Sequence, residues 1–294
     1  MQVIDGKLVS EKILNEVTEE VKALFHKGIT PTLAVVLVGD DPASAIYVRN
    51  KERACEKVGI RSVAHRLPAD IPEEELLALL HDLNQQKEVH AILLQLPLPK
   101  HLNSERLLAA ISADKDADGF HEENMGKLVL QKEGLPPCTP AGVMELLRHY
   151  QIEIAGKECV VVGRSNIVGK PMSLMLLNAN GTVTTCHSKT KNLQEICRRA
   201  DILVAAVGRP QMITSDYIKE GAVVIDVGIH RMENGKLCGD VLDTEGKAAY
   251  LTPVPGGVGP MTIAMLMKNC VKAAQKSIEQ KKTVGKLSQE NKVG

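Results

Sequence analysis

Apolar positions along the chain alternate between the spacing of an amphipathic helix and short continuous runs typical of buried strands. In residues 9–25 one apolar stripe recurs at helical spacing and ends before Gly28, which predicts a helix with a glycine stop. The stripe consists of Val9, Ile13, Val17, Val21 and Leu24. The next segment, LAVVLVG at 33–39, predicts a buried strand. Because this alternation recurs, we expect an α/β fold with parallel sheets.

In the first part of the chain, the strand at 33–39 is followed by a helix that carries Tyr47 and Lys51. Further strands are predicted at 62–67 and 91–99, separated by a helix at 72–83 with an acidic start. Pro97 and Pro99 should stop the last ladder just beyond Gln95, since proline cannot donate to it. The polar, turn-rich segment 113–120 is then expected to form the edge of a first domain.

The second part repeats this alternation. A helix is predicted at 138–150, with Thr139 as its N-cap and Pro140 as its first residue. Strands are expected at 159–163, 182–186, 202–207 and 222–227, and a final helix at about 262–278. We therefore expect two α/β domains around a cleft, 1–120 and 121–280, with the final helix able to pack back onto the first. Residues 281–294 are polar and lysine-rich and predict a solvated or disordered tail.

Composition excludes several classes of protein. The 294 residues carry 36 basic and 36 acidic side chains and only 2% aromatics, so neither a polyanion-binding surface nor a stacking platform for nucleic acid is expected. No apolar run is long enough to suggest a membrane span. The seven cysteines occur singly, without the CxxC pairs of a zinc site, and indicate a reducing cytoplasm rather than a disulfide framework.

The segment CVVVGRSNIVGKP at 159–171 has the strand–turn–helix context of a phosphate-binding loop. Gly163 would permit the tight turn, and Gly169 would let the following helix approach the sheet closely. The spacing is not GxGxxG, because Ser165 stands at the second glycine, and Pro171 replaces the Ser or Thr of an ATP-binding loop. A dinucleotide site is the hypothesis, and a purely structural turn is the alternative.

The next strand favours NADP over NAD. In dinucleotide folds a carboxylate about 20 residues after the glycine loop binds the ribose 2′-OH. TTCHSKT at 184–190 contains no carboxylate and instead offers donors suited to a 2′-phosphate. These donors are His187, Ser188 and Lys189 at the strand end, and Arg164 and Ser165 in the glycine turn add to them. The alternative is that Arg164 only covers a surface.

Lys51 lies on the apolar face of its predicted helix, four positions after Tyr47. An inward-facing lysine loses hydration, which disfavours its charged form and suits proton transfer near neutral pH. The alternative is a lysine whose stem covers apolar surface while its amine reaches water. Tyr-x-x-x-Lys also marks short-chain dehydrogenases, but there it follows the glycine loop, whereas here it precedes it.

Two more polar residues stand where α/β sheets bind ligands. Gln95 interrupts the apolar strand 91–99 near its carboxyl end, and Asp118 lies in the turn-rich DADGF. Alternatively, Gln95 is an edge amide satisfied by backbone, and Asp118 makes an Asx turn before Gly119.

Several motifs in the same order resemble one family, the bifunctional methylenetetrahydrofolate dehydrogenase/cyclohydrolases in their NADP-using form. The motifs are VGDDPASAIYVRNK, LQLPLPKHL, DKDADGFH, CTPAGV, VVVGRSNIVGKPM and TPVPGGVGPMT, and they span nearly the whole chain. The resemblance implies a folate between two lobes, NADP on the second lobe and a homodimer. It implies no metal.

The resemblance also assigns residues. Tyr47 would stack on the folate, Asp118 would hydrogen-bond the pterin, and Lys51, oriented by Gln95, would carry the proton and water chemistry. Arg164, Ser165 and Ser188 would hold the 2′-phosphate. Other implied cofactor contacts are Gly163, Ile167, Gly169, His187 and Ile229. The opposite side of the folate cleft would be lined by Pro255, Gly256, Gly257, Gly259, Pro260 and Thr262, although this segment can equally be a rigid loop capped by Thr262.

The implied reaction is oxidation of 5,10-methylenetetrahydrofolate by NADP⁺, followed by hydrolysis of the methenyl product to 10-formyltetrahydrofolate. The hydride step needs alignment more than an acid or base, whereas the attacking water needs a base. Two alternatives are a dehydrogenase with little cyclohydrolase activity and a catalytically silent NADP-sensing protein.

Overall fold

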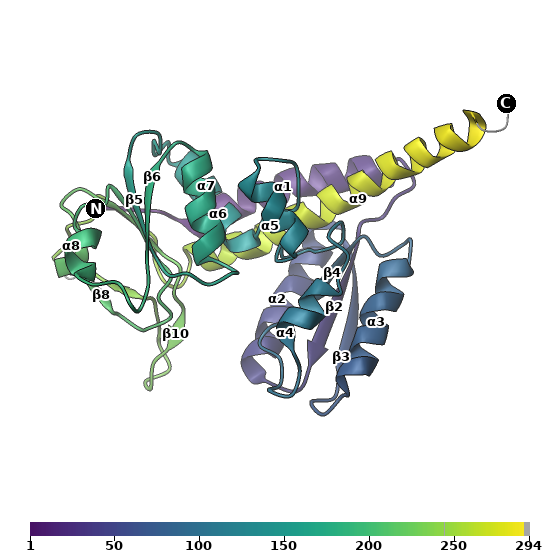
Figure 1. The fold of residues 1–294 in the computed structure, drawn as a ribbon, viewed down its shortest axis with the longest axis horizontal. Coiled ribbons are helices and arrows are strands. Elements are labelled where there is room, and N and C mark those ends of the chain that lie inside the picture. The colour runs from purple at the N-terminus through teal and green to yellow at the C-terminus, as the bar shows by residue number, and fades with distance from the viewer. Residues whose placement is uncertain (244, 291–294) are drawn as a thin grey trace. The chain divides into compact units, whose positions relative to one another are not determined.

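The computed structural model describes residues 1–243 and 245–290, with only the backbone of Ala43 and of 279–290. It divides into two compact units, each built on a parallel sheet (Figure 1). Of the described residues, the three-stranded unit comprises 13–126, 134–136 and 266–290, and the six-stranded unit comprises 1–12, 127–133 and 137–265. The expected α/β class with parallel sheets is confirmed.

The sheet of the three-stranded unit has the order β3-β2-β4. Its strands are β2 (Thr32–Val38), β3 (Arg61–Leu67) and β4 (Ala91–Leu94). Its helices are α2 (Pro42–Val58), α3 (Glu73–Gln85) and α4 (Ser104–Ala109), together with the larger parts of α1 (Gly6–Phe25), α5 (Glu122–Val129) and α9 (Val258–Glu290). β3 and β4 flank β2 on opposite sides, so the order in which the chain adds strands to the sheet reverses at β2. Parallel α/β sheets bind ligands at such a point.

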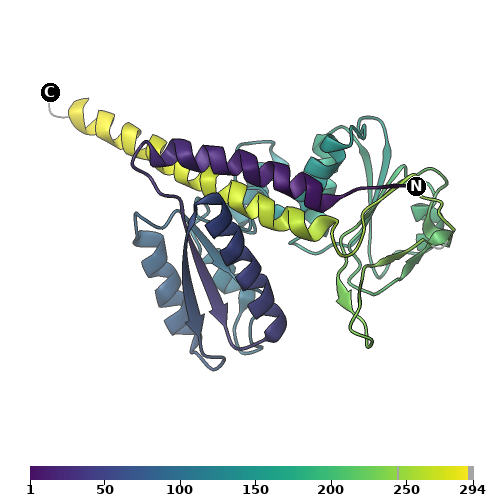
Figure 2. The ribbon, with the colours of Figure 1, turned by 180° about the vertical axis from the view of Figure 1, so that it is seen from behind.

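Alternating residues of β2 supply the two faces of this sheet. On one face Ala34, Val36 and Val38 pack in a single buried cluster with leucines of α3 and with Leu107 of α4. The sequence-predicted stripe of α1 is buried as expected. Within this unit α1 runs beside α9, where Gln275 donates to Glu20 at 3.3 Å (Figure 2).

A fourth stretch of chain extends the sheet beyond β4. The Ile92 amide donates to the Lys115 carbonyl at 2.7 Å, and the Ala117 amide donates to the Ile92 carbonyl at 3.2 Å. The resulting parallel bridge pairs Ile92 with Asp116. Two residues further along the chain comes Asp118, which therefore lies at the same edge of the sheet as the carboxyl end of β4.

The sheet of the six-stranded unit has the order β1-β13-β9-β7-β5-β6. Its strands are β1 (Gln2–Val3), β5 (Glu158–Val162), β6 (Thr182–Cys186), β7 (Ile202–Ala205), β9 (Val223–Asp226) and β13 (Tyr250–Leu251). The unit also holds α6 (Cys138–His149), α7 (Gly169–Asn178), α8 (Leu193–Cys197), a 3₁₀ turn η1 (Ser215–Tyr217), and the small pairs β8 (Ile213–Thr214) with β12 (Val241–Leu242) and β10 (His230–Arg231) with β11 (Leu237–Cys238). Strand order reverses at β5, which is flanked by β6 and β7.

Several boundaries differ from those expected. Residues 1–12 join the six-stranded unit, because β1 pairs with β13, and the unit boundary falls at Gly126 rather than at 120. Helix α6 begins at Cys138 with Pro137 as its N-cap, so Thr139 lies inside the helix and is not the cap. Helix α9 begins at Val258 and continues to Glu290, past the expected end at 278; of the expected tail, 291–294 lie outside the described residues.

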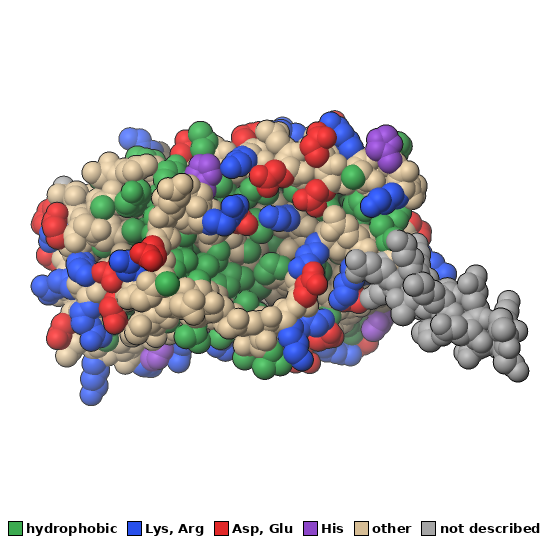
Figure 3. All heavy atoms as spheres, turned by 90° about the horizontal axis from the view of Figure 1, so that it is seen from above, with side chains coloured by type: hydrophobic (Ala, Val, Ile, Leu, Met, Phe, Trp, Pro, Cys, Tyr) green, Lys and Arg blue, Asp and Glu red, His purple; other side chains and the backbone are tan. Residues whose placement is uncertain are grey.

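Charges of both signs are mixed on the face of the molecule drawn in Figure 3. Basic and acidic side chains are interspersed there, in keeping with 36 of each in the sequence. Among the helices that the structure describes, none is long and apolar enough to cross a bilayer.

Gly6 at the start of α1 provides a test of packing in the six-stranded unit. A Cβ at Gly6 would lie 1.7 Å from the Gly257 carbonyl oxygen, so backbone must move to admit it. We expect Gly6→Ala to destabilise the protein by about 1–3 kcal/mol in urea unfolding. The matched control is Gly126→Ala in α5, where a Cβ meets nothing within 4 Å and should instead stabilise by roughly 0.5–1 kcal/mol. Equal unfolding midpoints for the two variants would contradict this packing.

Candidate functional site

Lys51 is buried on α2, as its position on the apolar stripe predicts. The helix starts at Pro42 after the Asp41 cap, whose carboxylate accepts from the Ser44 amide at 2.7 Å. The residues on the inward face, Val48 and Cys55, are fully buried, and Lys51 between them is only 8% exposed. The alternative of a lysine with its amine in open water is therefore wrong.

Gln95 holds the Lys51 amine. Lys51 Nζ donates to Gln95 Oε1 at 3.0 Å, and this bond is itself buried. The Gln95 amide group is fixed from its other side, because its Nε2 donates to the Leu96 carbonyl at 2.6 Å. Its backbone amide continues the ladder by donating to Val36 at 2.9 Å. Backbone thus satisfies one end of the side chain and orients the other toward the amine.

Asp118 is half-buried in the same unit, within the electrostatic reach of Lys51. Desolvation raises the pKa of the Asp118 carboxyl, the positive charge of Lys51 opposes this rise, and Asp116 adds to it. The Asx turn considered for Asp118 belongs instead to Asp116, whose carboxylate accepts the Gly119 amide at 3.1 Å. The Asp118 side chain is thereby left available for a ligand.

Three buried polar residues outside the predicted site, Asp116, Asn124 and Asn269, fix the loop that carries Asp118. Asp116 accepts the His121 amide at 2.8 Å and the Asn124 side chain at 3.0 Å. Asn269, from α9, donates to the carbonyls of Ala117 and Pro136, each at 2.9 Å. Asp116 lies in the polar segment DKDADG and could have been found from it. No local sequence pattern marks Asn269, because it lies far from the Asp118 loop in the sequence.

Tyr47 lies one helical turn before Lys51 and is 40% exposed. An aromatic ring that is exposed beside a buried amine suits stacking on a flat ligand. The structure thus brings Lys51, Gln95 and Asp118 together in one unit, with Tyr47 at their margin.

In the six-stranded unit, the chain after β5 forms the glycine turn. Gly163 has φ 146°, and a Cβ there would lie 2.3 Å from the Ala206 carbonyl oxygen. A Cβ at Gly169 would lie 2.3 Å from the Gly163 carbonyl oxygen. Both glycines are required by close backbone approach, as the spacing predicted. Ser165 caps the turn by accepting the amides of Val168 and Gly169 at 3.2 and 3.3 Å.

Basic and hydroxyl side chains from two neighbouring strands meet at this turn. β5 and β6 are parallel, Val162 pairs with Cys186, and the Gly163 amide donates to the Cys186 carbonyl at 2.9 Å. The register therefore places the turn residues beside those that follow β6. Arg164, Ser165, Ser188 and Lys189 are exposed, and His187 is half-buried.

Two apolar residues of the predicted cofactor set are exposed in this unit. Ile167, in the glycine turn, is 39% exposed, and Ile229, after β9, is 46% exposed. Large aliphatic side chains left open at the carboxyl ends of strands suit contact with a ligand ring.

The segment 255–262 also belongs to the six-stranded unit. Gly256 has φ 107°, and its carbonyl accepts the Lys7 amide at 3.1 Å. Gly256 and Gly257 are buried, whereas Pro255 and Gly259 are exposed. Thr262, inside α9 rather than at its cap, shares a hydrogen bond of 2.9 Å with Thr139. That this segment and Pro260 line a folate site remains a prediction.

These features define the class of the protein: a two-unit α/β protein with a doubly wound dinucleotide-type sheet in one unit and a buried lysine–amide–carboxylate site in the other. The tetrahydrofolate dehydrogenase/cyclohydrolase catalytic-domain model matches residues 4–118, and the NAD(P)-binding-domain model of the same family matches 137–278. The chain belongs to the tetrahydrofolate dehydrogenase/cyclohydrolase family.

Individual relatives agree over nearly the full length. The Bifunctional protein FolD of Lachnoclostridium phytofermentans is 58% identical over 276 residues, 93% of this chain and 98% of its own. The crystal structure of the bifunctional FolD enzyme from Campylobacter jejuni superposes with a TM-score of 0.92 at 51% identity, covering 94% and 99% of the two chains. A Trypanosoma brucei FolD complexed with NADP and an inhibitor superposes with a TM-score of 0.88 at 40% identity, covering 94% and 98%.

The electrostatic link between Lys51 and Asp118 can be measured. Because the positive charge of Lys51 lowers the pKa of Asp118, Lys51→Met should raise the pKa of this carboxyl further. The measurement is a carboxyl-carbon NMR titration of Asp118 in both proteins. Lys57→Met, the same substitution at an exposed position of α2, is the control and should leave the Asp118 titration in place. Coincident titrations of wild type and Lys51→Met would refute the link.

Proposed function

We propose that this protein oxidises 5,10-methylenetetrahydrofolate with NADP⁺ and then hydrolyses the methenyl product to 10-formyltetrahydrofolate. The observation that carries the proposal is the buried Lys51–Gln95 hydrogen bond beside the half-buried Asp118. An amine held by one oriented amide, next to a carboxylate, is the donor and acceptor set that a pterin ring and a reacting water require.

The residues around the glycine turn fit NADP. Gly163 and Gly169 let the turn pack tightly against neighbouring backbone, which brings the start of α7 to the carboxyl end of β5, where a pyrophosphate can bind. Exposed Arg164, Ser165 and Ser188 offer donors for the 2′-phosphate, and no carboxylate stands in 184–190 to prefer a 2′-hydroxyl. When bound, the cofactor accepts a hydride from the methylene carbon, and the folate nitrogens stabilise the resulting cation.

The hydrolytic step needs a base at the methenyl carbon. Water adds to that carbon, and the Lys51 amine, which accepts a proton only in its neutral form and is held by Gln95, takes the proton of the attacking water. The carbon–nitrogen bond to N5 then breaks as the hydroxyl of the adduct becomes the formyl carbonyl, the hydroxyl proton is transferred to N5, and the formyl group stays on N10. Asp118 binds the pterin, and Tyr47 stacks against the folate, so the first product need not leave before the second step.

The remaining expectations complete the proposal. Pro255, Gly256, Gly257, Gly259, Pro260 and Thr262 line the folate site, and the enzyme works as a homodimer in the cytoplasm, without nucleic acid or membrane as partner. The reducing compartment is supported by the seven cysteines, which form no disulfide within the described residues.

The direct test follows methenyltetrahydrofolate absorbance after methylenetetrahydrofolate is mixed with NADP⁺ or NAD⁺. Formation and decay of the methenyl species, faster with NADP⁺, is the expected result. Formation without accelerated decay would favour a dehydrogenase with little cyclohydrolase activity. Binding of NADP⁺ without turnover would favour a silent NADP-sensing protein.

Replacement of the buried amine should separate the two steps. We expect Lys51→Met to reduce the methenyl hydrolysis rate at least ~100-fold, the size of a lost general base, while the affinity for NADP⁺ stays within about twofold. The matched control is the exposed Lys57→Met, which should hydrolyse at the wild-type rate. Unchanged hydrolysis in Lys51→Met would remove this lysine from the chemistry.

Selectivity between the cofactors should depend on Arg164. A charge-assisted hydrogen bond to phosphate contributes about 1.5–3 kcal/mol, so Arg164→Ala should raise KM for NADP⁺ roughly tenfold or more and change KM for NAD⁺ much less. Lys157→Ala, which removes a cation before the amino end of β5, is the control and should leave both constants in place. An equal loss for NADP⁺ and NAD⁺ would undo the 2′-phosphate assignment.

A further inference from the structure

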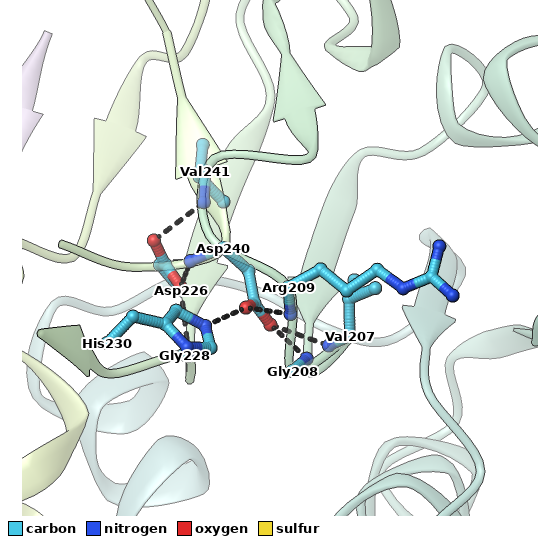
Figure 4. A network of polar contacts seen from close by, with 8 residues as sticks. All are labelled: Val207, Gly208, Arg209, Asp226, Gly228, His230, Asp240 and Val241. Atoms are coloured by element: carbon cyan, nitrogen blue, oxygen red, sulfur yellow. Dashed lines mark hydrogen bonds and ion pairs between the residues drawn. The ribbon is translucent and has the colours of Figure 1, made fainter. Parts of the chain in front are cut away.

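Two buried aspartates, Asp226 and Asp240, connect the ends of the strands β7, β9, β10 and β12 in the six-stranded unit (Figure 4). The Asp240 side chain, fully buried, accepts three consecutive backbone amides from the loop after β7. Its Oδ2 accepts from Val207 at 2.6 Å and Gly208 at 3.0 Å, and its Oδ1 accepts from Arg209 at 3.0 Å. Since a carboxylate can only accept, His230 donates the fourth bond from Nε2 at 2.7 Å.

Asp226, the last residue of β9, holds Asp240 in place. Its carboxylate accepts the backbone amides of Gly228, Asp240 and Val241, each at 2.9 Å. Burial raises the pKa of Asp226 to about 6, against the lowering effect of these amides. Above that pH the carboxylate is ionised and accepts all three bonds.

Glycines make this arrangement possible. A Cβ at Gly239 would lie 1.9 Å from the Asp226 carboxylate, and a Cβ at Gly228 would lie 2.5 Å from Asp240. The backbone is therefore folded tightly around both acids, and neither loop can shift without breaking several bonds.

The tethered loops lie where the cofactor is expected. Residues 207–209 follow β7 and residues 227–230 follow β9, so both loops lie at the carboxyl ends of parallel strands. The two strands lie on the same side of β5, which is the strand at which the order reverses. The exposed Ile229 stands between Gly228 and His230, which the two carboxylates bind. The network therefore sets the position of the one large apolar side chain between these anchors.

We propose that Asp240, oriented by Asp226 and His230, is a positioning residue for hydride transfer, which sets the loops 207–209 and 227–230 against the nicotinamide end of NADP. This inference rests on the proposed function for the identity of the cofactor. It assigns the network no part in the hydrolytic step, because Lys51, Gln95 and Asp118 all belong to the other unit.

The experiment compares Asp240→Asn with wild type in three measurements. They are the NADP⁺ dissociation constant by calorimetry, the steady-state constants for methylenetetrahydrofolate oxidation, and the hydrolysis rate of methenyltetrahydrofolate supplied directly, all at mildly alkaline pH. Asparagine has nearly the same shape as aspartate, but both oxygens of Asp240 accept backbone N–H groups. Whichever way the asparagine amide is turned, its NH₂ group faces at least one of these N–H groups, so a loop must move. A displacement of this kind should lower kcat/KM for NADP⁺ at least about tenfold, with hydrolysis within about twofold of wild type.

Asp201→Asn is the matched control. Asp201 also accepts a backbone amide, from Glu158 at 3.0 Å, but it precedes β7 and lies at the amino ends of the strands. It should leave all three measurements within about twofold of wild type. Should Asp240→Asn fail to fold, His230→Ala removes one charge-assisted donor and should still lower kcat/KM for NADP⁺ about threefold without affecting hydrolysis.

Unchanged oxidation and NADP⁺ affinity in the folded variant would overturn the positioning role. So would a parallel fall of oxidation and hydrolysis, because it would indicate a general loss of stability. Failure of the proposed function is distinguishable, since it would show as an inactive wild type, while the calorimetric comparison would still test whether Asp240 sets the cofactor site.

Discussion

In a parallel sheet the carboxyl ends of all strands lie at the same edge, and the positions of the candidate functional groups in this chain depend on that constraint. In the three-stranded unit, Gln95 follows β4, Asp118 follows the chain paired with Ile92, and α2, which carries Lys51, starts just beyond β2. In the six-stranded unit, the glycine turn follows β5 and Ser188 follows β6. The candidate functional residues of both units thus lie near the strand at which the strand order reverses, although the two sheets differ in size.

Buried carboxylates hold the loops at both edges. Asp116 accepts amides around Asp118, and Asp226 and Asp240 do the same after β9 and β7. A buried acid that accepts several backbone N–H groups satisfies donors a loop would otherwise leave unpaired, and at the same time fixes the loop. The side chains that we predict to face a ligand, such as Asp118 and Ile229, then do not have to hold these loops.

The sequence predicted the parts whose cause is local. The apolar stripe predicted that Lys51 faces inward, and the glycine spacing predicted the turn after β5, because helical periodicity and steric limits act over a few residues. The sequence did not predict the pairing of β1 with β13, or Asn269 beside the Asp118 loop, because these contacts join distant parts of the chain. Helix α9 also extends beyond the end that its apolar pattern predicted, because the residues that follow are polar but have good helix propensity.

The central claim is that one unit holds the reacting folate carbon at the Lys51 amine. A crystal structure of the protein with NADP and a stable analogue of methenyltetrahydrofolate tests it most directly. The account predicts the pterin on the Asp118 carboxylate, the ring of Tyr47 stacked on the ligand, and the methenyl carbon within reach of Lys51 Nζ, directly or through one water. A pterin bound elsewhere, with the Lys51–Gln95 pair closed off from the ligand, would contradict it.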